Sequence, residues 1–242
     1  MNLYTSSRYL KKNPTYHSED SLYKYNNFIK ILKKNNFTFK KVKKIIDIGC
    51  GVGEILKYLK KNKLFFRSDF IGYDVNKYAI KIAKKNSSIK FVCKDYIKFP
   101  KNEKSDLLIC ADVFEHFDND VNFLKKLLNQ SKYFLFNIPL DISLISLIRK
   151  NIFRQKFNDV GHIHFYSKYS ILLKLEYCGY QIIDNIYAKN RLEHFSKKEF
   201  SIKKFLILPF QFLFDLINED LACAIFGGYS LVVMAKKYGG SR

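Results

Sequence analysis

The sequence predicts an α/β fold, a parallel sheet with helices on both faces, formed by one domain over residues 1–242. Three observations predict it. Short apolar runs alternate with amphipathic segments, which is typical of parallel strands joined by helices. A glycine-rich turn joins the first such strand to its helix. No repeat or flexible linker divides the chain, and 242 residues that are 48% hydrophobic suffice for one core.

The N-terminal part, residues 1–42, is predicted to be an arm followed by a helix. Residues 1–20 are polar and aromatic and include Pro14. Residues 21–35 place apolar side chains at helical spacing, which predicts an amphipathic helix that packs against the core. That apolar face consists of Leu22, Tyr25, Phe28, Ile29 and Leu32.

Residues 43–139 carry the alternating pattern and form the predicted α/β core. Strands are expected at the apolar runs 44–49, 69–75, 90–95, 105–113 and 132–139. The amphipathic segments between them predict helices at 53–61, 76–85 and 119–130.

The remainder divides into a lid, residues 140–165, and a C-terminal half, residues 166–242. A helix is expected at about 141–150, before the segment VGHIHFYS, residues 160–167. Further elements are a helix over 167–180, strands at 181–188 and 229–237, and an insertion over 190–226. Within the insertion, FLILPFQFLFDLI predicts a helix that covers the sheet; the alternative is an amphipathic surface that touches a membrane or a lipid-linked acceptor.

Composition narrows the classes of partner. The net charge of +21 suggests nucleic acid, but only six of the 43 basic residues are Arg, the residue best suited to phosphate recognition. We therefore expect no nucleic-acid partner and attraction of small anions instead. The five Cys are scattered, and no signal peptide precedes residue 13. The most apolar run, 205–214, is too short to span a bilayer, so a cytoplasmic protein without membrane insertion is expected.

The glycine turn is the sharpest motif. In IIDIGCGVGEIL, Asp47, Gly49, Gly51 and Gly53 lie between a strand and a helix. Glycine lets the backbone turn tightly and approach a ligand closely, and the helix N-terminus offers N–H groups to an anion. Dinucleotide-binding folds use a similar turn, but their usual spacing is G-x-G-x-x-G, whereas this one is G-x-G-x-G.

Acidic residues follow the next three strands. Asp74, Asp95 and Asp112 come at or after the ends of the second, third and fourth strands. Each one alone is well explained as a turn residue or helix cap. As a series they fall on the sheet edge where open α/β folds bind ligands, and Asp74 is placed to accept hydrogen bonds from a ribose diol.

The residues DIGCGVG and ADVFEH resemble the class I S-adenosylmethionine (SAM)-dependent methyltransferases. The resemblance covers about 43–188 and the last strand, and it implies a Rossmann-like seven-stranded sheet in the order 3-2-1-4-5-7-6 with an antiparallel last strand. It implies SAM as cofactor and S-adenosylhomocysteine (SAH) as product. The cofactor-binding residues implied are Asp47, Gly49, Cys50, Gly51, Gly53, Asp74, Val75, Asp95, Tyr96 and Asp112.

A narrower resemblance covers nearly the whole chain. NPTYHSEDSLYK (13–24), IPLDIS (138–143) and VGHIHFYS are similar to segments of small bacterial methyltransferases that are often encoded with surface-polysaccharide genes, including those for O-methyl phosphoramidate capsule groups. Tyr16 and Tyr23 stand where that group usually has Trp. The resemblance implies an O-methyltransferase acting on a small, anionic acceptor.

Candidate acceptor-site residues follow from chemistry and position. A hydroxyl acceptor needs a general base, whereas a phosphate-type oxygen needs only donors and cations. If residues 161–165 are extended, His162 and His164 point to the same side, toward methyl transfer. With His17 they are the predicted catalytic residues. No third ligand stands at a recognisable spacing, so no metal site is predicted. The predicted substrate-binding residues are Tyr16, His17, Glu115, His116, His162 and His164.

Three other functions remain open. The charge is compatible with an RNA methyltransferase, although ADVFEH stands where an N-P-P-Y-like motif would be expected. A quinone or lipid O-methyltransferase at a membrane is a second alternative. A protein that binds SAM without turnover is a third alternative, because the intact glycine loop implies SAM binding but says nothing about catalysis.

Overall fold

The computed structural model describes residues 15, 18–85, 87–98, 104–193 and 202–239. Its centre is a seven-stranded sheet in the order β3-β2-β1-β4-β5-β7-β6. Strands β1 to β5 pair in parallel, and β7 is antiparallel to both of its neighbours, β5 and β6. The predicted fold is thereby confirmed. The strands are β1 (Lys44–Ile48), β2 (Asp69–Asp74), β3 (Lys90–Cys93), β4 (Ser105–Ala111), β5 (Ser131–Leu140), β6 (Tyr180–Ala188) and β7 (Tyr229–Lys237).

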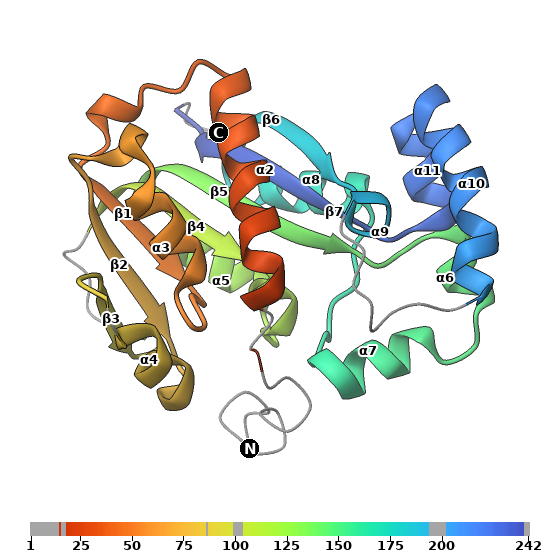
Figure 1. Ribbon diagram of the computed structural model, residues 1–242, viewed down its shortest axis with the longest axis horizontal. Helices are drawn as coiled ribbons and strands as arrows, with labels where there is room; N and C mark the ends of the chain where they lie inside the picture. The colour runs from red at the N-terminus through yellow and green to blue at the C-terminus, as the bar shows by residue number, and fades with distance from the viewer. Residues whose placement is uncertain (1–14, 16–17, 86, 99–103, 194–201, 240–242) are drawn as a thin grey trace.

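Helices cover both faces of the sheet (Figure 1). One face carries α2 (Ser21–Lys34), α3 (Glu54–Lys61) and α4 (Lys77–Lys84), whose apolar residues share one core cluster with alternate residues of the strands. The other carries α5 (Asp120–Leu127) and α8 (Lys168–Tyr177). Burial on both faces explains why the central strands are almost continuously apolar.

Short 3-10 turns connect several of these elements: η2 (Ser18–Asp20), η3 (Phe39–Lys41), η4 (Lys63–Phe65) and η5 (Phe114–His116). The strand expected over 105–113 ends at Ala111, and η5 follows it from Phe114. Asp112 has a φ of 54°, in the left-handed region, which ends the extended backbone of β4 at Ala111. This bend turns Glu115 and His116 toward the carboxyl edge of the sheet.

The lid differs from the prediction of one helix over 141–150. It forms two helices, α6 (Leu144–Ile148) and α7 (Ile152–Val160), which lie beyond the carboxyl ends of the strands (Figure 1). Asn151, with a φ of 70°, separates them, because Asn tolerates a left-handed conformation that a helix cannot contain. Gly161, also left-handed, ends α7 and starts the histidine segment.

The 190–226 insertion contains α9 (Asn190–Glu193), α10 (Ile202–Ile217) and α11 (Glu219–Phe226). The expected helix exists, but α10 packs mainly on α11 rather than covering the sheet. Its side chains Phe210, Phe212, Leu213, Leu216 and Ile217 remain exposed. None of the described helices combines the length and apolar character that a membrane crossing requires.

Asp120 ties α5 to α8 across the second face. Its carboxylate accepts a hydrogen bond from the Tyr166 hydroxyl at 2.6 Å and pairs with Lys174 of α8. Burial raises the pKa of Asp120, but these donors outweigh burial and hold it below its usual range. A carboxyl group with a lowered pKa stabilises the fold above its unfolded pKa, and this contribution disappears as pH falls through the folded pKa.

We therefore expect Asp120→Asn to lower the free energy of unfolding by about 1.5–3 kcal/mol at pH 7, the range for hydrogen bonds to a charged group. Urea unfolding followed by circular dichroism measures the difference. Glu176→Gln, on the exposed side of α8, is the control and should change little. The Asp120 effect should shrink below about pH 4, where unfolded Asp is protonated; an undiminished difference at pH 3 would contradict the assignment.

Candidate active site

A cavity of about 1460 Å³ opens at the carboxyl edge of the sheet. That volume exceeds the usual range for a single small ligand, so a cofactor and an acceptor can both be held. Its wall comes from the ends of β1, β2, β4 and β5, from the lid and from the start of α2. Nine of the ten predicted cofactor residues line it: Asp47, Gly49, Cys50, Gly51, Asp74, Val75, Asp95, Tyr96 and Asp112.

Gly53, the tenth, does not line the cavity and has a packing role. With a φ of 79°, it is the N-cap of α3, and a Cβ there would lie 2.4 Å from the ring of Phe91. Gly51 has a φ of 53°, but a Cβ on it would meet nothing within 4 Å. The open side of Gly51 is where a ligand can approach the backbone.

Asp74 holds the loop in place. Its carboxylate accepts hydrogen bonds from the amides of Gly51 at 2.8 Å and Asn76 at 2.7 Å. Burial raises the pKa of Asp74, and these backbone donors act against that rise. A carboxylate has about four acceptor positions, so two amides leave capacity for a ribose diol.

Asp47 is the second buried acid in this half of the cavity. It is 2% exposed, and its Oδ2 accepts no hydrogen bond from the residues that the structure describes. Burial and the neighbouring Asp74 raise its pKa well above the usual value. An ammonium group would satisfy such an oxygen, and the methionine end of SAM carries one. The residues present therefore fit the cofactor implied by the sequence.

Asp112 connects the cofactor half to the acceptor half. Lys24 of α2 forms an ion pair with its carboxylate at 2.6 Å, and Asn137 of β5 donates to it at 2.7 Å. Burial alone would raise the pKa of Asp112, but Lys24 and Asn137 hold it below the usual range. The arrangement fixes the lysine of α2 at the cavity wall.

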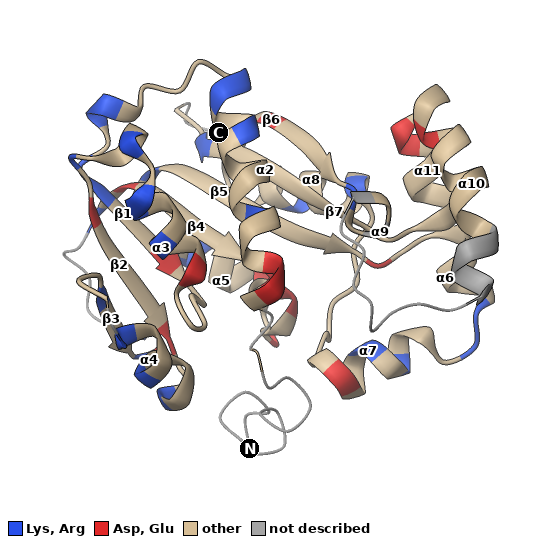
Figure 2. Cartoon of the chain, viewed as in Figure 1, with Lys and Arg blue, Asp and Glu red and all other residues tan. Residues whose placement is uncertain are grey.

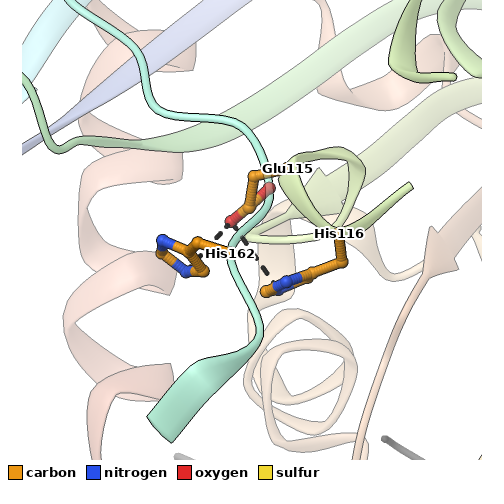
Figure 3. A group of neighbouring side chains, drawn as sticks. All are labelled: Glu115, His116 and His162. Atoms are coloured by element: carbon orange, nitrogen blue, oxygen red, sulfur yellow. Dashed lines mark ion pairs between the residues drawn. The ribbon is translucent and has the colours of Figure 1, made fainter. Parts of the chain in front are cut away.

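The acceptor half contains His116, His162 and, behind them, Glu115 (Figure 3). The Nε2 atoms of both histidines lie 3.9 Å from Oε1 of Glu115. Asp141, immediately after β5, approaches Nδ1 of His162 with its Oδ2 at 2.7 Å and also pairs with Lys156 of α7. Desolvation, with His162 nearby, lowers the pKa of His116 to about 4. This imidazole is therefore neutral at pH 7.

Glu115 is fully buried and does not line the cavity, unlike a residue that touches substrate. Burial, Asp112 and Asp141 raise its pKa well above the usual value. Its backbone carbonyl accepts hydrogen bonds from the amides of Ile163 and His164 at 3.0 and 3.1 Å. These bonds fasten the histidine segment to η5.

The structure separates the two histidines of VGHIHFYS and corrects the expectation that both face methyl transfer. His162 lines the cavity, whereas His164 is not part of the wall. Nε2 of His164 lies 2.9 Å from the Phe117 carbonyl, and its Nδ1 is 3.9 Å from Asp120. Consecutive amides of a regular strand point in opposite directions, so two that donate to one carbonyl show that the segment is not a regular strand.

Tyr16 and His17 lie outside the described residues. Sequence reasoning missed Lys24, Asp141 and Lys156, all of which line the cavity. Asp141 carries the same signal as the other acids, since it directly follows a strand. Lys24 and Lys156 carry none, because they are two of many lysines on amphipathic helices.

The family model described as "Methyltransferase domain" matches residues 22–185. The chain belongs to this family. The match covers α2, the glycine loop, the lid and the histidine segment. It confirms the predicted class I SAM-dependent methyltransferase superfamily, and with it the cofactor, without naming an acceptor. No curated protein sequence matches the chain significantly.

Solved methyltransferase structures share the fold. The plantazolicin methyltransferase BpumL, solved with SAH, is 22% identical over 94% of this chain and 88% of its own, with a TM-score of 0.57. A SAM-dependent methyltransferase from Archaeoglobus fulgidus is 22% identical over 96% of this chain and 100% of its own, with a TM-score of 0.59. One from Clostridium acetobutylicum is 14% identical, covers 91% and 93%, and has a TM-score of 0.55.

Asp74→Ala should weaken SAH binding by about 1.5–3 kcal/mol, or roughly 10–150-fold in Kd, because it removes the acceptor for a ribose diol and frees the Gly51 amide. Isothermal titration calorimetry with SAH measures the change. Asp69→Ala, at the exposed opposite end of β2, is the matched control and should bind SAH as the unmodified chain does. Equal affinities for both variants would contradict the cofactor pose.

Proposed function

We propose that this methyltransferase transfers a methyl group from SAM to an oxygen of a small acceptor in the same cavity. The observation that carries the proposal is the position of His162 on the cavity wall. Oδ2 of Asp141 lies 2.7 Å from its Nδ1, and its Nε2 lies 3.9 Å from Oε1 of Glu115, behind the wall. An oriented imidazole of this kind is needed by a hydroxyl acceptor.

The cofactor half of the cavity binds and positions SAM. The loop from Gly49 to Val52 would hold the methionine end of SAM, and Asp47 would accept a hydrogen bond from its ammonium group. Asp74 would accept from the ribose hydroxyls, and Asp95 and Tyr96 would contact the adenine. Bound SAM supplies a methyl group on a sulfonium, already activated for displacement, so positioning supplies most of the remaining rate.

The acceptor half prepares the oxygen. Methyl transfer forms an O–C bond and breaks the C–S bond, whose electron pair stays on sulfur, while the hydroxyl proton leaves. Nδ1 of His162 donates to Asp141, so in the neutral form of the imidazole Nε2 carries the electron pair. That pair can withdraw the hydroxyl proton or hold a cation that polarises the oxygen.

The acceptor is a small anionic metabolite, of the sugar or phosphate type used in surface-glycan synthesis. Arg149 lines the cavity at the end of α6 and has no acidic partner among the residues that the structure describes. It is placed to bind an anionic group of the acceptor. In the part of the chain that the structure describes, Lys and Arg are otherwise spread over many elements (Figure 2).

A second candidate is a lipid-linked acceptor, favoured by the apolar surface near the lid. In α10, Phe210, Leu216 and Ile217 are 62%, 68% and 75% exposed. In α6, which packs against α11, Leu147 and Ile148 are 64% and 71% exposed. Co-sedimentation with vesicles that is abolished by Leu216→Asp would favour this candidate over a free metabolite.

His162→Gln should reduce turnover by about 10²–10⁴-fold and change SAH affinity less than twofold, because the histidine acts on the acceptor and not on the cofactor. SAH release is measured with nucleotide-linked sugars, sugar phosphates and phosphoramidates as acceptors. His164→Gln is the matched control, since its imidazole lies outside the cavity.

The result that would overturn the role of His162 is retained turnover in His162→Gln. Loss of turnover in His164→Gln alone would move the acceptor site to the other side of the segment. Loss of SAH binding in His162→Gln would show that the variant disturbs the cofactor half as well.

A further inference from the structure

Three potential metal ligands meet behind the acceptor half of the cavity (Figure 3). One ligand atom each from Glu115, His116 and His162 lies within 4.8 Å of the other two. Glu115 and His116 come from η5, and His162 from the segment after α7. The backbone bonds from Ile163 and His164 to the Glu115 carbonyl hold the two segments together.

The hydrogen bonds of both imidazoles turn an electron pair toward Glu115. Nδ1 of His116 lies 3.0 Å from the Gly161 carbonyl, and Nδ1 of His162 lies 2.7 Å from the Asp141 carboxylate. Carbonyl and ionised carboxylate oxygens only accept, so both Nδ1 atoms are donors. In a neutral imidazole the other nitrogen, Nε2, then has no proton. Both Nε2 atoms face the same carboxylate oxygen of Glu115, each at 3.9 Å.

Glu115 makes this arrangement unfavourable without a further positive group. It is 0% exposed, and neither of its carboxylate oxygens accepts a hydrogen bond from the described residues. Burying an unpaired carboxylate is costly. At 3.9 Å, neither Nε2 atom is close enough to form a hydrogen bond with the carboxylate. A cation between the three ligand atoms would compensate the buried charge of Glu115.

We propose that Glu115, His116 and His162 bind one divalent transition-metal ion, with an open coordination position toward the cavity. Two imidazoles and a carboxylate suit Zn²⁺, Fe²⁺ or Co²⁺ better than Mg²⁺ or Ca²⁺, which prefer oxygen ligands alone. Three protein ligands and an open position are typical of catalytic rather than structural sites. Sequence spacing concealed the set, because the third ligand is 46 residues beyond His116.

The hydrogen-bond partners of His116 and His162 are of the kinds found at metal sites. A histidine that binds a metal through one nitrogen usually donates its other N–H to a carboxylate or a backbone carbonyl. His162 has the first kind of partner and His116 the second. Around a metal at about 2.0–2.1 Å, tetrahedral ligand atoms are roughly 3.3 Å apart. The ligand atoms of the three residues now lie within 4.8 Å of one another, so rotations of the side chains would have to bring them together by up to about 1.5 Å.

The role of the ion rests on the proposed function. His116 and His162 line the cavity and Glu115 lies behind them, so the open position faces the acceptor. A metal there polarises the acceptor oxygen and lowers the pKa of a hydroxyl group. The proton leaves to water, and the oxygen becomes the nucleophile for the methyl group. The electron pair of His162 is then used in metal binding.

The test measures metal binding directly, without an acceptor. The full chain is stripped with a chelator and titrated with Co²⁺, whose visible absorption reports ligand geometry, and with Zn²⁺ against a chromophoric competitor. We expect one ion per chain. Glu115→Gln and His116→Ala should weaken metal affinity by at least about 100-fold, because each removes a ligand. Asp141→Asn should weaken it by about 10–100-fold, the range typical of residues that hydrogen-bond to a ligand. His164→Gln should bind the metal normally.

Equal Zn²⁺ affinity in the unmodified chain and Glu115→Gln would overturn the site, as would no stoichiometric binding by the unmodified chain. Glu115→Gln keeps the side-chain shape, so it remains informative if His116→Ala fails to fold. A thermal shift with SAH on the same metal-free samples separates the two proposals. SAH binding without metal binding would overturn only the metal site, and metal binding without SAH binding would overturn the proposed function.

Discussion

The acceptor half of this protein depends on one backbone contact, between the Glu115 carbonyl and the amides of Ile163 and His164. The side-chain contacts of His162 with Asp141 and of His164 with the Phe117 carbonyl reinforce it. The contact sets His162 opposite His116 and aligns Nδ1 of His162 with Asp141. It is made possible by the left-handed Asp112, which ends β4, and by the left-handed Gly161, which ends α7.

Buried charge is concentrated at the same edge of the sheet, and its compensation divides the cavity into two kinds of site. Asp74 is satisfied by backbone amides, and Asp112 and Asp141 by lysines from α2 and α7. These pairs belong to the fold itself. An oxygen of Asp47 and both oxygens of Glu115 accept nothing from the described residues. Buried polar atoms without partners are rare, and the ammonium group and the metal ion proposed above would satisfy these.

Helices α2 and α7 each supply a lysine to the cavity. Helix α2 covers one face of the core with Phe28 and Ile31, yet its Lys24 reaches the cavity. Helix α7 buries none of its residues and supplies Lys156 to Asp141. Helix α2 therefore connects the core to the site, whereas α7 contributes to the site from the surface. Changes in either helix would alter the electrostatics of Asp112 or Asp141 without touching the glycine loop.

The sequence by itself determined the α/β class and the cofactor half, because each signal there is local. Glycines at G-x-G-x-G and acids at strand ends need only the chain direction and the parallel sheet to bring them together. The acceptor half was decided by tertiary structure. Period-two spacing placed His162 and His164 on one side, but two consecutive amides share one carbonyl and the backbone turns between them. Glu115, His116 and His162 became neighbours, and Lys24 and Asp141 joined the wall, through contacts between distant segments that no spacing along the chain encodes.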